Sequence, residues 1–436
     1  MHHLPLNQNI SGWLAQHPQR AVFPALTAAI DADWVVIGAG YAGLAFARRL
    51  AALKPAWKIA VLEAGTAYES ASGRNSGFII GLPHNIGSST AELKKAHAYR
   101  QLLQAGMQRL KALVDAHRIE CAWDAAGKYH CQVAVGQEKI LQRYCASLEQ
   151  MAEDYQLLNR DELQEKLGTR FYHKAIFTPY TVLVNPALLI AGLAATLPAN
   201  VTLYEHSPAL ALDYQRGGVT VYTATGAVRA QKAMLATNAL SSHLLPGVRR
   251  QAAMATFASL TPPLTEQQLA RLPQMTSWGL TPVNAIAGAT LRFTQDRRFL
   301  LRQHVIPALH GNISARQTQR AARLHHQLFR KVYPQLEDVA FSHCWSGTIS
   351  VTRNGAPQWG KINPFLYTAG GCNGAGISKQ TIAGELLADY AVGQDHPLLA
   401  AMQALGKASW LPPSPVLDIA IHGALQKERW QGRKER

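Results

Sequence analysis

Three glycines follow a short apolar run near residue 35, and their spacing is typical of a turn that holds phosphate groups. The run Asp33–Ile37 ends at Gly38, and Gly40 and Gly43 come next. The first glycine permits a tight bend, the second leaves room for a pyrophosphate, and the third lets a helix pack on the strand. N–H groups at the start of that helix would face the phosphates. A turn with a purely structural role is the alternative. We expect dinucleotide contacts at Gly38, Ala39, Gly40, Tyr41, Ala42 and Gly43.

An acidic residue stands where the ribose of such a dinucleotide would lie. The apolar run Lys58–Leu62 ends in Glu63, twenty residues after Gly43. A carboxylate in this position accepts hydrogen bonds from the ribose hydroxyls and repels a 2′-phosphate, so NADP is disfavoured. FAD and NAD share this pattern, but the sequence has no second complete G-x-G-x-x-G unit as an obvious place for NAD(P). We expect ribose contacts at Glu63 and Ala64.

A small-residue segment shortly after Glu63 carries the first resemblance to a known family. Ser70–Gly77 reads SASGRNSG, and with it the sequence resembles the D-amino-acid oxidase superfamily of FAD enzymes. It is most similar to the branch that holds gamma-glutamylputrescine oxidoreductase and related amine oxidases. In that family the segment wraps the flavin, and its small residues let the backbone lie against the ring. The resemblance implies FAD as cofactor, with flavin contacts at Ser72, Gly73, Arg74, Asn75, Ser76 and Gly77.

Four later blocks resemble the same family in the expected order, and the first, Val184–Leu188, is similar to the segment where the chain returns from the substrate domain. Val201–Ala209 is similar to the strand that ends at the adenine, and Ala233–Ala239 to a strand end beside the cofactor. Gly370–Ser378 is similar to the glycine-rich start of a helix beneath the pyrimidine edge of the flavin, where helix N–H groups stabilise the negative charge of the reduced ring. The resemblance implies further cofactor contacts at Ala209, Thr237, Asn238, Gly371, Asn373, Gly374, Ala375, Gly376, Ile377 and Ser378.

The same block departs from relatives that oxidise sarcosine. Those relatives have a histidine and a carboxylate-binding lysine where this sequence has Ala375 and Ser378, and Lys379 comes one residue late. Arg302 could pair a substrate carboxylate in a bidentate way, and Trp345 could line an apolar or cation-binding wall. The alternatives are a surface arginine on an edge strand and a core tryptophan.

Cysteine usage indicates a reduced protein with non-covalently bound FAD. The five cysteines are odd in number and have no metal-ligand spacing, so we expect reduced thiols and no metal. The flavin-linking cysteine of the sarcosine-oxidising relatives aligns near Gly347, and Cys344 lies three residues away from that position. We therefore expect FAD to be held without a covalent bond.

We expect an α/β fold in which a Rossmann-like FAD-binding domain is interleaved with a mixed-sheet α+β substrate domain. Helix-like periodicity covers 91–116 and 136–156, and strand-like patterns cover 128–135 and 251–304. The expected domains are an N-terminal extension (1–30), the FAD-binding domain (31–90, 180–245 and 350–400), the substrate domain (91–179 and 246–349) and a C-terminal tail (401–436).

Composition limits the partners. The formal net charge is +16, but the basic residues are dispersed except in Lys427–Arg436, so we expect a solvated surface with a sticky basic tail. Nucleic acid is therefore an unlikely partner, and peripheral membrane contact is possible. The longest apolar run is about half the roughly 20 residues that a membrane-spanning helix needs, and the N-terminus lacks a secretory pattern, so we expect a cytoplasmic protein.

Together these features predict FAD-dependent oxidation of a small-molecule amine or amino acid. Hydride transfer to flavin N5 would give an imine, and O2 or another acceptor would reoxidise the flavin. No catalytic side chain is assigned, because the cofactor carries the chemistry. The alternatives are a dehydrogenase that passes electrons to a quinone or carrier, a flavoprotein that modifies transfer RNA, and a flavin-bound sensor.

Overall fold

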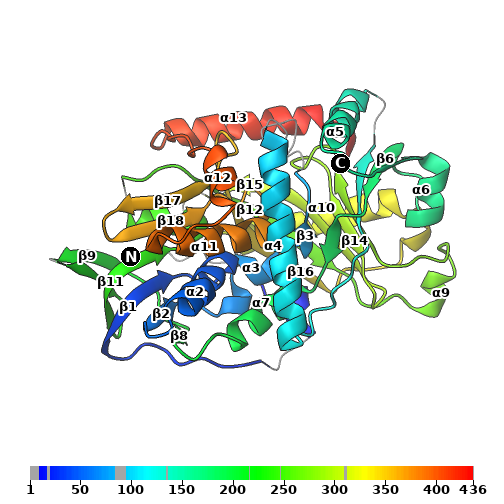
Figure 1. Cartoon of the computed structure of the whole chain (residues 1–436). Coiled ribbons are helices and arrows are strands. Elements are labelled where there is room, and N and C mark those ends of the chain that lie inside the picture. The colour runs from blue at the N-terminus through cyan, green and yellow to red at the C-terminus, as the bar shows by residue number, and fades with distance from the viewer. Residues whose placement is uncertain are drawn as a thin grey trace.

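The computed structural model describes residues 9–16, 20–83, 95–133, 136–215, 217–245, 247–308 and 312–435. Within these ranges the strands form two eight-stranded sheets and one two-stranded ribbon (Figure 1). Helices pack on both sheets, so the predicted α/β class with a second, mixed sheet is confirmed.

The first sheet has a parallel centre. From β18 to β8 each neighbouring pair is parallel, β17 pairs antiparallel with β18, and the hairpin β9–β10 pairs with β11. Because parallel strands point the same way, their carboxyl ends meet at one edge. The order is β17 (Gln358–Asn363), β18 (Leu366–Gly370), β11 (Ala227–Leu235), β1 (Ala29–Ile37), β2 (Ile59–Leu62) and β8 (Val201–Tyr204), with β9 (Ala211–Gln215) and β10 (Gly218–Tyr222) beside β11.

The central strands are apolar on both faces because both faces are covered. On one side Trp34, Val36 and Val61 share a core with four helices, and on the other Val35 and Ile37 pack beneath the β9–β10 hairpin. Continuous apolar runs are typical of parallel strands buried in this way. The helices are α2 (Tyr41–Leu53), α4 (Ala96–His117), α7 (Pro186–Ala195) and α11 (Gly376–Val392).

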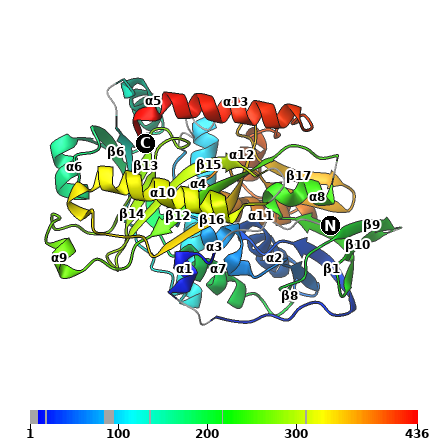
Figure 2. The same ribbon diagram turned by 180° about the vertical axis from the view of Figure 1, so that it is seen from behind.

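The second sheet is mixed. Helix α10 (Ala315–Val332) covers one of its faces (Figure 2), and the opposite face of β16 and β12 contributes Trp345, Ala258 and Leu260 to the core of the first sheet. The order is β16 (His343–Val351), β12 (Ala252–Leu260), β15 (Phe299–Pro307), β14 (Thr290–Phe293), β13 (Trp278–Pro282), β4 (Lys128–Gln132), β6 (Lys174–Thr178) and β5 (Gln156–Asn159).

The two helices predicted at 91–116 and 136–156 are present, but the second ends earlier than predicted. Helix α4 falls in the stretch predicted at 91–116, whose residues 91–94 lie outside the described ranges. Helix α5 (Glu138–Gln150) stops six residues before the predicted end at 156. The cause is local, because Ala152 has a φ of 55°, which no helix can continue. Residues 134 and 135 of the predicted strand 128–135 lie outside the described ranges as well.

The C-terminal segment is docked rather than free. After α12 (Leu399–Ala404), α13 (Val416–Gln431) lies across the top of the molecule and ends beside α5 (Figure 1). Arg429 donates to the Val305 carbonyl of β15 at 2.8 Å, and Glu435 is buried. The carboxylate of Glu435 accepts hydrogen bonds from the Asn284 backbone N–H and the Gln137 amide. The end of the predicted basic tail is therefore docked against the loop after β13, which offers polar partners. The division into domains given above stays a proposal.

Candidate active site

The turn after β1 is closed by contacts that only glycine allows. Gly38 has a φ of 107°, and a Cβ on Gly43 would lie 1.9 Å from the Gly38 carbonyl oxygen. Helix α2 therefore begins directly against the end of β1, with its first N–H groups at the carboxyl edge of the sheet. This is the arrangement that the spacing of the glycines predicts, and it suits a pyrophosphate.

Glu63 at the end of β2 is fixed beside this turn. Its carboxylate is buried and accepts hydrogen bonds from the backbone N–H groups of Ala39 at 2.9 Å and Gly65 at 3.2 Å. Burial raises the pKa of Glu63, and the backbone N–H groups around it oppose that shift. Each carboxylate oxygen has a second lone pair. The group is thus oriented and still able to accept hydrogen bonds from a ribose.

The segment Ser72–Gly77 lies beside the same turn. A Cβ on Gly40 would come within 2.8 Å of the Ser72 hydroxyl, and Tyr41 donates its hydroxyl to the Ser72 carbonyl at 3.2 Å. Asn75 closes its own loop, donating to the Ser72 carbonyl at 2.6 Å and accepting from the Gly77 N–H at 2.8 Å. Two segments predicted from separate motifs are therefore neighbours.

Arg74 joins this segment to the second sheet. Within the short helix α3 (Ala71–Arg74), its guanidinium donates to the Ser346 carbonyl at 2.7 Å, and its own carbonyl accepts from the Trp345 indole at 2.9 Å. Burial lowers the pKa of Arg74 to about 10, so it remains a cation at neutral pH. Its guanidinium donates hydrogen bonds to backbone carbonyls, so Arg74 positions the backbone of neighbouring segments.

The ends of β11 and β18 are tied together next to these elements. Ser350 donates to the Asn238 side chain in the 3₁₀ turn η3 (Asn238–Leu240), and its hydroxyl accepts from the Cys372 N–H at 3.0 Å. Asn373, with a φ of 49°, is held by the Thr352 N–H at 2.9 Å. A Cβ on the exposed Gly374 would meet no heavy atom within 4 Å. Space is therefore open at the backbone just before α11 begins.

One buried polar atom at this edge has no partner, and it fits a bound dinucleotide. The Thr237 hydroxyl, directly after β11, makes no hydrogen bond to the part of the chain that the structure describes. A phosphate or ribose oxygen would satisfy it. The carboxyl ends of five parallel strands thus gather the turn, the acidic residue and this unsatisfied hydroxyl. The predicted contact residues lie after β1 (Gly38, Ala39, Gly40, Tyr41, Ala42, Gly43), β2 (Glu63, Ala64, Ser72, Gly73, Arg74, Asn75, Ser76, Gly77), β8 (Ala209), β11 (Thr237, Asn238) and β18 (Gly371, Asn373, Gly374, Ala375, Gly376, Ile377, Ser378).

The two predicted substrate residues share one row and one face of the second sheet. Trp345 on β16 pairs with Ala258 on β12, which pairs with Arg302 on β15. Arg302 donates to the Ala285 carbonyl at 3.2 Å, and burial lowers its pKa to about 10. Trp345 is fully buried, with its ring 6.4 Å from that of Trp13, which supports the core alternative for this residue.

Arg292 is a residue of this face that the sequence did not single out. Its guanidinium is buried and donates to the carbonyls of Ser76 and Val184, each at 2.8 Å. It also lies 5.0 Å from the ring centre of Trp13. The alternation of polar and apolar residues along Thr290–Phe293 could have marked it, because a charged residue between two buried ones needs a partner.

The contacts of Lys379 and Cys344 do not match the roles of the carboxylate-binding lysine and the flavin-linking cysteine of family members. The Lys379 ammonium donates to the Cys372 carbonyl at 3.4 Å and lies 5.0 Å from the centre of the Tyr99 ring. The Cys344 thiol contacts the Thr318 carbonyl on α10, on the opposite face from Gly347. All five cysteines are free thiols. These contacts support a non-covalent cofactor.

The described residues hold no group of three or more His, Cys, Asp and Glu side chains that could bind a metal ion. Among those same residues, no helix combines the length and the apolar character that crossing a membrane requires.

A parallel sheet with a dinucleotide-binding turn at its carboxyl edge, joined there to a second sheet, is typical of enzymes that use a dinucleotide cofactor. The protein-family model described as FAD dependent oxidoreductase (DAO) matches residues 33–390, and the chain belongs to this family. FAD is accordingly its cofactor, and it is an oxidoreductase of the amine and amino-acid oxidase type.

Three known proteins illustrate the similarity. The probable oxidoreductase OrdL of Haemophilus influenzae is 28% identical over 390 residues, which cover 86% of each chain. The gamma-glutamylputrescine oxidoreductase of Escherichia coli is 24% identical over 401 residues, covering 88% of this chain and 89% of that protein. The structure of glycine oxidase from Geobacillus kaustophilus superposes with a TM-score of 0.71 at 19% identity, covering 88% of this chain and all of that one.

Proposed function

We propose that this chain oxidises an amine or amino acid that carries a carboxylate, with the reacting C–H bond held between the carboxyl edge of the first sheet and the Arg302 face of the second. The observation that carries the proposal is Arg302 itself. It is a half-buried cation, and among the described residues its side chain makes one hydrogen bond, to a backbone carbonyl. It lies on the sheet face that also holds the segment Ser72–Gly77 through Arg292. A second, anionic partner would complete its donor set.

FAD, when bound, would supply a two-electron acceptor for the hydride of the carbon next to a neutral amine, and water would hydrolyse the imine product. The protein itself positions the substrate and excludes water. Arg302 would bind the carboxylate, and the packed interface of the two sheets would exclude water from the reacting atoms. The N–H groups at the start of α11 would favour negative charge near Gly374 and Gly376. We assign no general base.

The names of the relatives support this substrate class, since they include a gamma-glutamylputrescine oxidoreductase and a glycine oxidase. The test is anaerobic mixing of the FAD-loaded protein with polyamines, gamma-glutamylated amines, N-methyl amino acids and D-amino acids. The expected result is loss of the visible flavin absorbance with a carboxylate-bearing amine and little change with the matching decarboxylated amine. Failure of every carboxylate-bearing compound in the panel to bleach the flavin would contradict the proposal.

The electron acceptor needs its own measurement. During turnover in air, hydrogen peroxide formed in a one-to-one ratio with the oxidised amine identifies O2 as the acceptor. Rapid anaerobic reduction followed by slow reoxidation in air, with fast reoxidation by a soluble quinone, identifies a dehydrogenase.

A further inference from the structure

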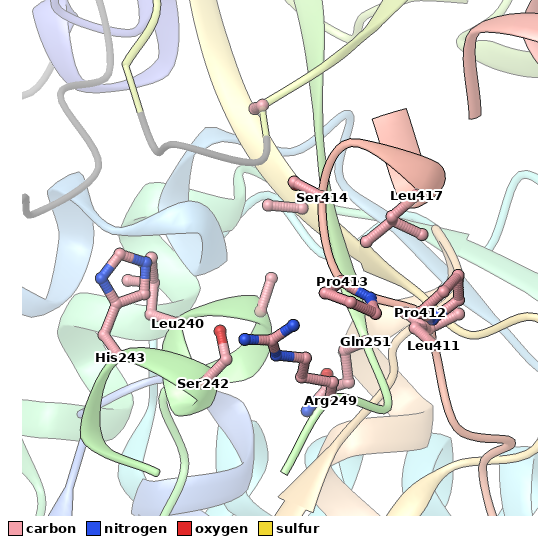
Figure 3. Close-up of a pocket in the computed structure, with 13 residues that line it drawn as sticks. Leu240, Ser242, His243, Arg249, Gln251, Leu411, Pro412, Pro413, Ser414 and Leu417 are labelled. Atoms are coloured by element: carbon pink, nitrogen blue, oxygen red, sulfur yellow. The ribbon is translucent and has the colours of Figure 1, made fainter. Parts of the chain in front are cut away.

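A pocket separate from the predicted cofactor contacts lies between the end of β11 and the C-terminal segment. Its volume is about 300 Å³, which is at the lower limit for a small-molecule site. One wall is the turn formed by η3 and α8 (Ser241–Leu244), and the other is the segment 411–417 that leads into α13 (Figure 3). None of its lining residues is among the predicted FAD contacts.

Polar groups gather on one side of this pocket. The Arg249 side chain reaches across the opening, with Ser242 and His243 on one side of it and Pro413 on the other (Figure 3). No hydrogen bond or ion pair joins the guanidinium of Arg249 to any residue within the described ranges, although Ser242 and His243 line the same pocket. A guanidinium with a hydroxyl and an imidazole nearby is a typical oxyanion-binding set.

Apart from Gln251 and Ser414, the remaining lining residues are apolar. Leu240, Leu411 and Leu417 contribute side chains, and Pro412 and Pro413 form a rigid rim. A bare inorganic anion would leave this surface in contact with water. The combination therefore suits a small molecule with an anionic head and a short hydrocarbon body.

The floor of the pocket connects to the cofactor side. Gln251 accepts a hydrogen bond from the Gly371 N–H at 2.7 Å and donates to the Ser241 hydroxyl at 3.2 Å. Gly371 begins the turn before α11, and Ser241 follows η3. A ligand in the pocket would thus rest on a side chain that holds a predicted FAD-binding turn in place.

We propose that this pocket is a second ligand site, which binds a small organic anion through Arg249, Ser242 and His243 and packs its hydrocarbon part against Leu240, Leu411 and Leu417. The ligand holds the C-terminal segment against the end of β11. Its head group is a carboxylate or a phosphate ester, and its body is about the size of a branched four-carbon chain.

The proposal is tested by calorimetric titration of the FAD-loaded protein at 150 mM salt with isovalerate, isobutyl phosphate and the neutral isovaleramide. At least one anion is expected to bind with a Kd on the order of 1 mM, and isovaleramide at least tenfold more weakly. The head group that binds more tightly distinguishes the carboxylate from the phosphate ester.

Three variants locate the binding. Arg249→Gln is expected to weaken anion binding at least tenfold. Arg143→Gln, which removes an exposed arginine of α5, is expected to change it less than twofold. Arg302→Gln leaves this binding intact, which separates the pocket from the proposed substrate site. The proposal fails if neither anion binds at 20 mM, if the neutral amide binds equally well, or if Arg302→Gln rather than Arg249→Gln abolishes binding.

Discussion

The first sheet contributes to the active site mainly through its backbone, and the second sheet mainly through side chains. At the carboxyl edge of the first sheet the contacts depend on backbone: the absence of a Cβ at Gly43, N–H groups at the start of α2 and α11, and open space at Gly374. On the facing side of the second sheet they depend on long side chains, Arg292 and Arg302, whose positions follow from strand register. Backbone requirements restrict residue type at fixed spacing, whereas a long side chain can reach the same point from several positions.

The first prediction concerns the backbone contacts at the carboxyl edge of the first sheet. In Gly43→Ala the new Cβ would lie 1.9 Å from the Gly38 carbonyl oxygen, and neither backbone can move without separating α2 from β1. We expect a loss of more than about 3 kcal/mol in the free energy of unfolding, with little or no bound FAD. Thermal unfolding and the visible absorbance of the purified protein measure both effects.

The matched control is Gly423→Ala on α13, where a Cβ would meet no heavy atom within 4 Å. It should leave FAD content unchanged and raise stability by up to about 1 kcal/mol, because alanine is the better helix former. Equal behaviour of the two variants would mean that close packing of α2 on β1 is not what the glycine provides.

A second prediction breaks the contact between the halves. Arg292→Met keeps most of the side-chain volume but removes the donors to the carbonyls of Ser76 and Val184. Leaving buried acceptors unpaired should lower stability by about 3 kcal/mol. Denaturant unfolding with and without excess FAD measures this loss. Arg297→Met, which removes only the exposed ion pair with Glu266, should cost at most about 1 kcal/mol. The idea is wrong if the two losses are equal.

The same contrast explains what could be predicted from the sequence. The cofactor turn and Glu63 follow from spacing, because only one geometry suits G-x-G-x-x-G between a strand and a helix. The helix start at Gly376 was expected from the family resemblance instead. Arg292 was missed, since its importance comes from residues about 100 and 200 positions away that meet it only after folding. Trp345 was found but its partners were not, because the ring packs on Trp13, which lies more than 300 positions earlier in the chain.

A third prediction sharpens the side-chain half. Arg302→Gln should lower kcat/KM about 100-fold, or about 2.7 kcal/mol, for carboxylate-bearing amines and less than threefold for amines without a carboxylate. FAD content should not change. Arg302→Lys keeps the charge but loses the bidentate geometry, so it should recover only part of the activity. Steady-state kinetics with matched pairs of substrates tests this, and an equal loss for both members of each pair would exclude Arg302 as the carboxylate-binding group.

The smallest effect concerns the tail that closes the second sheet. Burial raises the pKa of Glu435 to about 7, and the nearby Glu428 adds to the shift. The folded state therefore binds this proton more tightly than the unfolded chain does. The stability it contributes is complete below the ordinary pKa of a glutamate and is lost as pH rises through about 7. Glu435→Gln keeps an acceptor for Asn284 and Gln137 but cannot ionise, so it should stabilise the protein by about 2 kcal/mol at pH 6 and by almost nothing at pH 4. Exposed Glu165→Gln on α6 (Arg160–Leu167) should change stability equally at both pH values. If Glu435→Gln behaves like Glu165→Gln, the tail is not held by a buried carboxyl, and the docking of α13 depends on Arg429 and Leu425 instead.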